Sequence, residues 1–542
     1  MVSPASDSPV SRSSARTTFW TPAAALVCLC LALVYLGTTG VLPILGKDEP
    51  RYVQIGHEMF QSGDYITPRL GGHTWFEKPI LLYWLVAGAF KVFGVSEWSA
   101  RLGSGLCGLG TVALVWWMIR PVNEKWANWS ALSLASSIGL LAFAHNATFD
   151  IVLTFCTTMA LAALFRAQIE PDAKRREKWL ALFWIGTALA FLAKGLVAFL
   201  LTLATAGLYR LIRGRVLAGS SVPTPSAAPL SQALAPSKER VASAQPQPDS
   251  EWKRLGWLWG LPLCLLVSGL WYVPVSLANP RIFLYEFFWK HQFLRYTTNE
   301  FHHHQPPYFY LKILPLFLLP WTPFFLSHVW QTRLRVLREP SDESRLKAFG
   351  WAWLVLPFAF FSASGSKLPS YILPALPGAF VLIGWSLARW IETHRQNKLR
   401  FGIAAGLLGL MLGGGSLLAL TPIGVSRAEH ESVRHLFRAA DARGYSRLPV
   451  VNFDTLERTA QFYAAGRLLY GSDGEPLRFD EPAQIAALAH RRPVLVLTIE
   501  KEDKKNPQKS KRDIERLEAL PSIQVERIAV QGDVALVRVS ER

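Results

Sequence analysis

Charged residues and cysteines are scarce in this chain of 542 residues. Lys, Arg, Asp and Glu make up 18% of it, whereas hydrophobic residues make up 51% and tryptophan occurs 21 times. This composition argues against an ordinary soluble enzyme and is typical of a polytopic membrane protein. The five cysteines lie in apolar stretches, where a thiol behaves as a small hydrophobe, and no CxxC pair occurs. A disulfide framework and a cysteine-based metal site are therefore not expected.

Acidic residues are also few, with 39 Asp and Glu against 57 Lys and Arg and a formal net charge of +18. The basic residues are dispersed over short segments between apolar runs, without a nucleic-acid-binding motif. We therefore expect membrane lipids with anionic headgroups as partners, and no nucleic acid. The six basic clusters are Arg12–Arg16, Arg120–Lys125, Arg166–Lys178, Arg210–Arg254, Arg333–Lys347 and Arg389–Arg400. The positive-inside rule predicts that these segments are cytoplasmic.

Neighbouring cytoplasmic clusters require an even number of crossings between them, and the apolar runs supply pairs nearly everywhere. The exception lies between residues 20 and 120, where three apolar runs occur and two crossings are needed. The run Pro79–Gly94 begins with proline, contains Lys91 and falls short of the roughly 20 residues that a crossing needs. We therefore expect it to lie in the interface at the outer surface. The whole chain is then predicted to have about eleven crossings.

Several regions follow from this topology. Residues 1–20 are expected to form a cytoplasmic tail, and residues 21–421 a transmembrane domain. Within that domain residues 217–250, rich in Ala, Ser and Pro, are expected to be a disordered cytoplasmic linker. Residues 422–542 are expected to form a soluble α/β domain on the outer side, because short apolar runs typical of strands alternate there with charged helical segments. The predicted fold class is a polytopic α-helical membrane protein with a small C-terminal α/β domain.

The first outer loop contains two adjacent carboxylates. Asp48 and Glu49 stand directly before Pro50 and Arg51, where a helix is predicted to begin. Capping would explain one carboxylate, since proline suits the first turn of a helix and a carboxylate suits its N-terminus. Two carboxylates beside an arginine at the mouth of a span favour a functional site instead.

Cations recur in the same outer segments. The first loop ends in Glu77 and Lys78, directly before the surface helix, and further outer cations are Lys194, Arg295 and Lys367. A lysine at a membrane surface is often only a headgroup anchor. However, a phosphate leaving group needs positive charge where its negative charge develops, and a sugar hydroxyl that attacks needs a carboxylate base. The pattern of outer cations and carboxylates therefore predicts glycosyl transfer from a lipid phosphate.

Four segments carry a family resemblance: Lys47–Tyr52, Phe76–Pro79, His302–Tyr308 and Ser366–Pro374. They are similar to segments of the bacterial GT-C glycosyltransferases that include the lipid A aminoarabinose transferases, and more distantly to the protein O-mannosyltransferases. The resemblance extends over residues 20–390. It implies an undecaprenyl-phosphate or other polyprenyl-phosphate sugar donor and an inverting transfer on the periplasmic side of the inner membrane. It also implies a surface helix after the first outer loop, which the run lengths predict independently.

The resemblance implies roles for individual residues. Asp48 matches the central catalytic carboxylate of the family, and Glu49 beside it is a second catalytic candidate. The residues expected to contact the donor phosphate are Arg51, Lys78, Lys194, Arg295, Lys367 and Tyr371. The aminoarabinose transferases have somewhat more crossings than we predict here. The acceptor therefore stays open between a lipid A-like glycolipid and a protein hydroxyl.

The histidines leave a metal site as an alternative. Glu77 matches a carboxylate that can take part in a metal site in such enzymes. His302, His303 and His304 are consecutive, and adjacent side chains diverge, so a polar loop is the simpler interpretation of all three. A zinc or magnesium ion held by Glu77 with His302 and His304 is the alternative.

Two non-catalytic classes compete with the enzyme. A transporter of lipid-linked sugars would bind the same headgroup, but the charged residues cluster on one face instead of lining a path through the midplane. A structural scaffold leaves the outer carboxylates and lysines without explanation. We therefore predict a polyprenyl-phosphate-dependent glycosyltransferase, with aminoarabinose as the candidate sugar.

Overall fold

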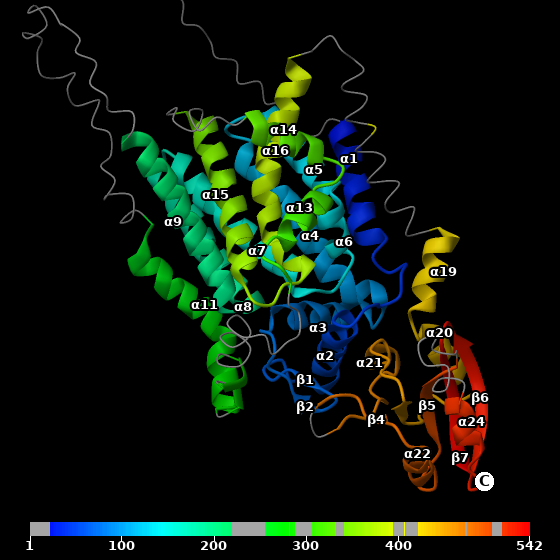
Figure 1. Ribbon diagram of the computed structural model, residues 1–542. Helices are drawn as coiled ribbons and strands as arrows, with labels where there is room; N and C mark the ends of the chain where they lie inside the picture. The colour runs from blue at the N-terminus through cyan, green and yellow to red at the C-terminus, as the bar shows by residue number, and fades with distance from the viewer. Residues whose placement is uncertain are drawn as a thin grey trace, which may run out of the picture.

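The protein is a bundle of long helices with a smaller domain, built around a β-sheet, at one end (Figure 1). The computed structural model describes residues 22–218, 255–280, 282–283, 285–287, 305–331, 341–393, 406, 421–471, 474–500 and 512–542. The elements of the helical part are α1 (Pro22–Ala32), η1 (Leu33–Gly37), α2 (Glu49–Ser62), β1 (Arg69–Leu70), β2 (His73–Thr74), α3 (Leu81–Phe93), α4 (Glu97–Ile119), α5 (Glu124–Ala135), α6 (Ile138–Ala144), α7 (Phe149–Ile169), α8 (Ala173–Lys194), α9 (Leu196–Ala218), α11 (Trp257–Ala278), α13 (Phe309–Phe317), α14 (Thr322–Gln331), α15 (Asp342–Ala363), η6 (Pro369–Ala375) and α16 (Leu376–Glu392).

Polar side chains mark the starts of several helices. Ser96 accepts a hydrogen bond from the Ser99 amide, and the Ser99 hydroxyl accepts one from the Ser96 amide, so a capping box begins α4. Asn123 caps α5, since its side-chain oxygen accepts a hydrogen bond from the amide of Trp126. These caps satisfy amides that have no partner within the helix, and they fix where each long helix starts.

The number of crossings differs from the prediction. Among the described residues six helices are long and apolar enough to cross a membrane, or eight if each of two bent pairs, α5 with α6 and α13 with α14, counts as one span. The prediction of about eleven is not confirmed. One reason is that several expected runs form short or bent helices. Another is that the linker from residue 219 to 254 and the apolar run from residue 407 to 420 lie outside the described residues.

The surface helix predicted for Pro79–Gly94 corresponds to α3. This helix has 13 residues, which is too short for a straight crossing. It runs across the end of the bundle, beside α2 (Figure 1). Gly94 ends it with a positive φ of 78°, and α4 starts at once in a new direction.

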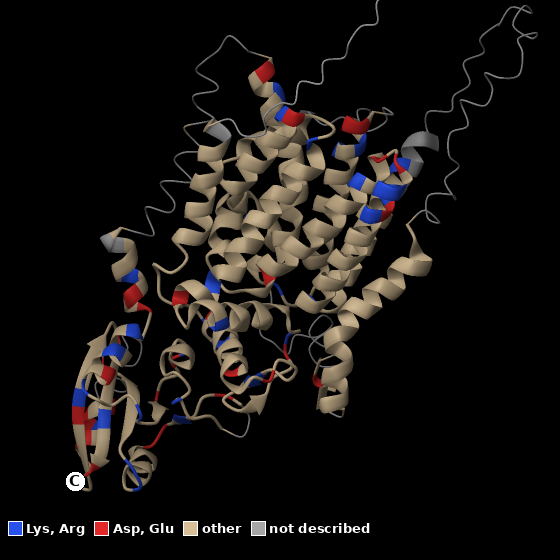
Figure 2. Cartoon of the chain, turned by 180° about the vertical axis from the view of Figure 1, so that it is seen from behind, with Lys and Arg blue, Asp and Glu red and all other residues tan. Residues whose placement is uncertain are grey.

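The described residues of the predicted cytoplasmic clusters lie at the opposite end of the bundle (Figure 2). Lys125 at the start of α5 lies 2.7 Å from Glu392 at the end of α16, measured from Nζ to Oε1. Arg166 near the end of α7 donates a hydrogen bond of 3.2 Å to the carbonyl of Trp117 near the end of α4. Figure 2 shows charged residues at this end and the C-terminal domain at the other. The charge pattern thus separates the two ends of the bundle as the sequence predicts.

The C-terminal domain contains α19 (Pro422–His430), α20 (Arg434–Ala442), β3 (Val450–Phe453), α21 (Ala460–Tyr463), β4 (Arg478–Phe479), α22 (Pro482–Ala489), β5 (Val494–Ile499), α24 (Arg512–Glu518), β6 (Ile523–Gln531) and β7 (Val534–Glu541). Its sheet has the order β4-β3-β5-β7-β6, with β3 parallel to both β4 and β5 and the last two strands antiparallel. Apolar side chains on both faces of the sheet are buried, because helices cover each face. The predicted fold class, a helical membrane protein with a C-terminal α/β domain, is confirmed.

Candidate active site

Four side chains of the first outer loop form a continuous chain of alternating charge. Asp48 Oδ1 lies 2.6 Å from Arg51 Nη2, Glu77 Oε2 lies 3.3 Å from the same nitrogen, and Glu77 Oε1 lies 2.8 Å from Lys78 Nζ. Asp48 and Arg51 come from the start of α2, whereas Glu77 and Lys78 come from the segment before α3. The structure therefore brings together four residues that the sequence singled out.

Asp48 is the accessible member of this chain. Its side chain is 48% exposed, and it occupies the N-cap position of α2 without making a side-chain capping bond. Helix capping therefore does not explain the residue. Its carboxylate is free to meet a second molecule while it remains paired with Arg51.

Arg51 is the hub of the cluster. Its guanidinium carbon lies 5.2 Å from the ring of Trp75 and 5.6 Å from that of Tyr52. Burial opposes the charge of Arg51, but Glu77, Tyr52 and Asp48 outweigh burial and raise the pKa of the guanidinium. The side chain therefore stays cationic while it is 15% exposed.

Glu49, the second predicted catalytic carboxylate, has a different surrounding. Its two oxygens lie 2.7 and 2.8 Å from the Arg101 guanidinium of α4 and also accept hydrogen bonds from the amides of Leu45 and Ala147. Glu49 is 4% exposed and Arg101 is 2% exposed. A carboxylate with both oxygens engaged in this way is a structural anchor, and we withdraw it as a candidate base.

Arg101 itself is the main residue that the sequence analysis missed. Besides Glu49, it donates to the carbonyls of Thr39, Leu42 and Pro43 at 2.7 to 2.9 Å. It is a cation close to the outer end of an apolar run, which is the same signal that drew attention to Lys194 and Lys367. The position of a cation at the end of an apolar run therefore predicts Arg101 as well as Lys194 and Lys367.

A second pair lies where α7 begins and α8 ends. Lys194 donates a short hydrogen bond to Asp150, and its Nζ lies 4.0 Å from the centre of the Tyr371 ring. Both charged side chains are mostly buried, with exposures of 11% and 12%. Gly195 directly follows with a φ of 72°, which turns the chain from α8 into α9 at this point.

Lys367 lies in the segment between α15 and η6. Its ammonium group donates to the carbonyls of Ser364 and Gln305, and burial lowers its pKa. These two carbonyls hold the side chain, and a third N–H remains for another acceptor.

Aromatic rings connect the two charged groups. Phe149, next to Asp150 in the chain, makes edge contacts with Tyr52 at 5.0 Å and with Tyr83 at 5.2 Å between ring centres. Burial, and after it the charge of Glu77, raises the pKa of both tyrosines, so they keep their protons. Tyr52 directly follows Arg51 in the chain, and Phe149 directly precedes Asp150, so ring contacts link the neighbours of the two charged groups.

Several buried donors near these charges have no acceptor within the part of the chain that the structure describes. They are the Nε of Arg51, the indole N–H of Trp75, and the hydroxyls of Tyr83 and Thr148. Buried polar groups are normally hydrogen-bonded. A ligand rich in oxygen acceptors, such as a phosphate or a sugar, would satisfy them.

The remaining predicted residues cannot be placed. Arg295, His302, His303 and His304 lie outside the described residues. Within the described part of the chain no group of three His, Cys, Asp or Glu side chains could hold a metal ion. Glu77 instead has one oxygen on Lys78 and the other near Arg51. A metal ion at Glu77 would have to displace one of these cations.

Comparisons with known proteins agree on the kind of molecule. A family model described as dolichyl-phosphate-mannose-protein mannosyltransferase matches residues 77–229. The undecaprenyl phosphate-alpha-4-amino-4-deoxy-L-arabinose arabinosyl transferase 2 of Pseudomonas fluorescens strain Pf0-1 is 29% identical over 412 residues, which cover 74% of this chain and 66% of the relative. A similarly named transferase of Shewanella sediminis is 26% identical and covers 70% of this chain and 62% of the relative. The chain thus spans just under two thirds of the length of these relatives.

A solved structure shares the fold over nearly the whole chain. ArnT from Cupriavidus metallidurans, crystallised with undecaprenyl phosphate, superposes with a TM-score of 0.72 over 96% of this chain and 98% of that one, at 20% sequence identity. Its apo form gives a TM-score of 0.70. The predicted resemblance to the lipid A aminoarabinose transferases is therefore confirmed, and it includes the C-terminal domain.

Proposed function

We propose that this chain is a glycosyltransferase of the bacterial inner membrane, which moves a sugar from a polyprenyl-phosphate donor to a lipid A-like acceptor on the periplasmic side. The names of its relatives supply the candidate sugar, 4-amino-4-deoxy-L-arabinose. Two features support the proposal. One is the shared fold. The other is the position of α2 and α3, which the charged cluster adjoins, at the end of the bundle beside the C-terminal domain (Figure 1).

The observation that carries the proposal is the chain of charges from Asp48 to Lys78. It presents an accessible carboxylate at one end and a cation at the other, held together by Arg51 and Glu77. A transfer from a lipid phosphate needs both groups, because the phosphate leaves with negative charge while the acceptor oxygen attacks.

The chemistry then divides between the two ends. The bond between the sugar C1 and the phosphate oxygen breaks, its electron pair goes to the phosphate, and Lys78 with Arg51 stabilises the charge that develops. The acceptor oxygen forms the new bond to C1 from the opposite side. If that oxygen belongs to a hydroxyl, Asp48 takes its proton; if it belongs to an ionised phosphate, Asp48 orients the acceptor through Arg51.

The second pair has a supporting role in this proposal. Lys194 is fixed between Asp150 and Tyr371, and Lys367 is fixed by two carbonyls. In this proposal both cations contact the donor phosphate, and their fixed partners give them the preorganisation that charge stabilisation requires. Tyr371 would provide the aromatic face beside this site.

A protein hydroxyl is the second candidate acceptor. The match of residues 77–229 to the family described as dolichyl-phosphate-mannose-protein mannosyltransferase favours it, because that description names a protein as the acceptor. In that case the donor site is the same and only the acceptor differs.

The test is a deletion strain complemented with variants. Mass spectrometry of lipid A should show loss of the sugar on deletion, recovery with the wild type and no recovery with Asp48→Asn. The matched control is Asp64→Asn, a carboxylate of the same loop that accepts bonds from the amides of Ile66 and Thr67 and faces solvent. Unchanged lipid A together with loss of a sugar from envelope proteins would favour the second acceptor. No change in either would refute the proposed function.

A further inference from the structure

The segment that leads into Asp48 has no regular secondary structure, but side chains from other parts of the chain hold it by hydrogen bonds. It runs from Thr38, after η1, to Asp48, at the start of α2. Arg101 binds three of its carbonyls, and the Leu45 amide donates to Glu49. The position of Asp48 therefore depends on side chains outside the segment.

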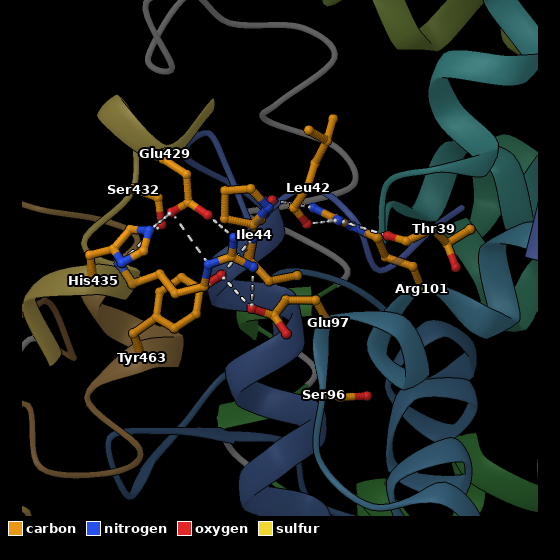
Figure 3. Close-up of polar contacts among 12 residues, drawn as sticks. Thr39, Leu42, Ile44, Ser96, Glu97, Arg101, Glu429, Ser432, His435 and Tyr463 are labelled. Atoms are coloured by element: carbon orange, nitrogen blue, oxygen red, sulfur yellow. Dashed lines mark hydrogen bonds and ion pairs between the residues drawn. The ribbon is translucent and has the colours of Figure 1, made fainter. Parts of the chain in front are cut away.

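One of these side chains comes from the C-terminal domain. The amide of Ile44 donates a 2.8 Å hydrogen bond to the hydroxyl of Tyr463, which is 419 residues further along the chain. That hydroxyl in turn donates to Glu97 Oε1 at 3.2 Å, and Arg434 Nη1 donates to the same oxygen at 3.2 Å. Figure 3 shows Tyr463, Glu97 and Ile44 converging at this point.

Glu97 and Arg101 act on the segment together. They are one turn apart on α4, so they lie on the same face of that helix. Arg101 holds the segment directly, while Glu97 holds it through Tyr463. Helix α4, which binds Glu49 through Arg101, thus also contacts the C-terminal domain through Glu97.

The contact is partly buried and fully paired. The side chains of Arg434 and Glu97 are 11% and 17% exposed, and Arg434 also pairs with Glu429, which His435 contacts at 3.2 Å. Burial raises the pKa of Tyr463, so the hydroxyl keeps its proton and can accept from Ile44 while it donates to Glu97.

The C-terminal domain also contacts the segment from Gly71 to Trp75, which leads to Glu77 and Lys78. The Tyr470 ring packs directly on Gly71, where a Cβ atom would lie 2.2 Å from the ring. Gly474 lies against Trp75, the residue that covers Arg51. The C-terminal domain therefore contacts both segments that supply the charged cluster.

We propose that Tyr463 and Arg434 are positioning residues of the transferase, which hold the Thr38–Asp48 segment through Ile44 and Glu97 and so set the place of Asp48. This inference rests on the proposed function. It assigns the C-terminal domain an indirect part in the chemical step, through the position of Asp48.

The test compares Tyr463→Phe with a matched control, Tyr445→Phe. Tyr445 also donates its hydroxyl to a glutamate, Glu526, but within the sheet domain. In full-length protein in nanodiscs, Tyr463→Phe should lower kcat by about ten- to a hundredfold, the scale of a small misplacement of a reacting group. Undecaprenyl phosphate should bind within about twofold of wild type, because Lys78 is held by other contacts.

Hydrogen exchange separates this effect from general damage. The backbone amides of residues 39–49 should exchange faster in Tyr463→Phe than in wild type and in the control variant. Glu97→Ala, which removes the oxygen that accepts from Tyr463 and Arg434, should give the same defect. The double variant should be no worse than either single one, because both changes remove one network.

Three results would overturn the inference: unchanged exchange of the segment, faster exchange with kcat equal to that of the control, or a parallel loss of donor affinity. If the wild type transfers no sugar, the proposed function fails. The exchange measurement then still decides whether the C-terminal domain holds the segment.

Discussion

Arg101 of α4 and Glu49 of α2 form a buried ion pair with two contacts of 2.7 and 2.8 Å between nitrogen and oxygen. The pair fixes the start of α2, and so it fixes the backbone of Asp48, which directly precedes Glu49. One carboxylate of the adjacent pair is thus buried against an arginine, whereas the other, Asp48, is 48% exposed.

Removal of one partner of this pair should destabilise the protein strongly. In Glu49→Ala the Arg101 charge remains buried without its carboxylate, which costs about 3–5 kcal/mol of unfolding free energy. Thermal unfolding in detergent measures the loss. The control is Glu392→Ala, which breaks the exposed pair with Lys125 and should cost at most about 1 kcal/mol.

Glu49→Gln distinguishes an anchor from a base. The amide keeps the shape of the side chain and its carbonyl can still accept from Arg101. We expect turnover per folded molecule to fall by less than about tenfold, well short of the loss typical of a missing general base. Loss of turnover in fully folded protein would return Glu49 to the mechanism.

Asp48→Asn should leave folding and donor binding intact while it removes the chemistry. The side chain is half exposed and makes no capping bond, so little stability depends on its charge. Transfer should fall by about 100-fold or more, the usual scale for a general base. Steady-state kinetics with purified donor and acceptor measure this, and turnover close to that of Asp64→Asn would remove Asp48 from the mechanism.

Lys78 should bind the donor phosphate. Lys78→Met should abolish transfer and weaken donor binding by about 1.5–3 kcal/mol, the scale of a charge-assisted hydrogen bond. Lys78→Arg should be intermediate, because it keeps the charge and changes the donor geometry. Titration with undecaprenyl phosphate in detergent measures the affinities. Lys91→Met, at the exposed end of α3, is the matched control, and equal affinities in all variants would contradict the phosphate role.

The site end of the bundle should face the periplasm. In a variant without native cysteines, an impermeant thiol reagent should label Ser62→Cys and Ser446→Cys in outer-permeabilised cells. It should not label Glu177→Cys, which lies among the basic residues at the start of α8. All three positions are exposed. Labelling of Glu177→Cys alone would show that the protein has the opposite orientation in the membrane.

Much of the fold and the four members of the charged cluster follow from short-range patterns. Hydrophobic runs set where helices form, and the basic clusters separate the two ends, because burial and charge act on each segment without reference to its neighbours. For the same reason the short run Pro79–Gly94 could be distinguished from the helices long enough to cross a membrane. Asp48, Arg51, Glu77 and Lys78 also stand close together along the chain, in one loop. The number of crossings was predicted less well, since a run such as α13–α14 bends where an apolar pattern alone suggests a straight helix.

Only the tertiary structure decides which of these residues are buried in ion pairs and which stay exposed. Glu49 meets an arginine 52 residues away, Phe149 joins two charged groups, and Ile44 meets Tyr463 across 419 residues. Such pairings depend on how helices pack and where a second domain docks, and no local periodicity encodes them. A buried charge is stable only where it meets a partner of opposite charge, so Asp48 and Glu49, adjacent in sequence, end in opposite surroundings: Glu49 is buried against Arg101 of α4, and Asp48 stays exposed.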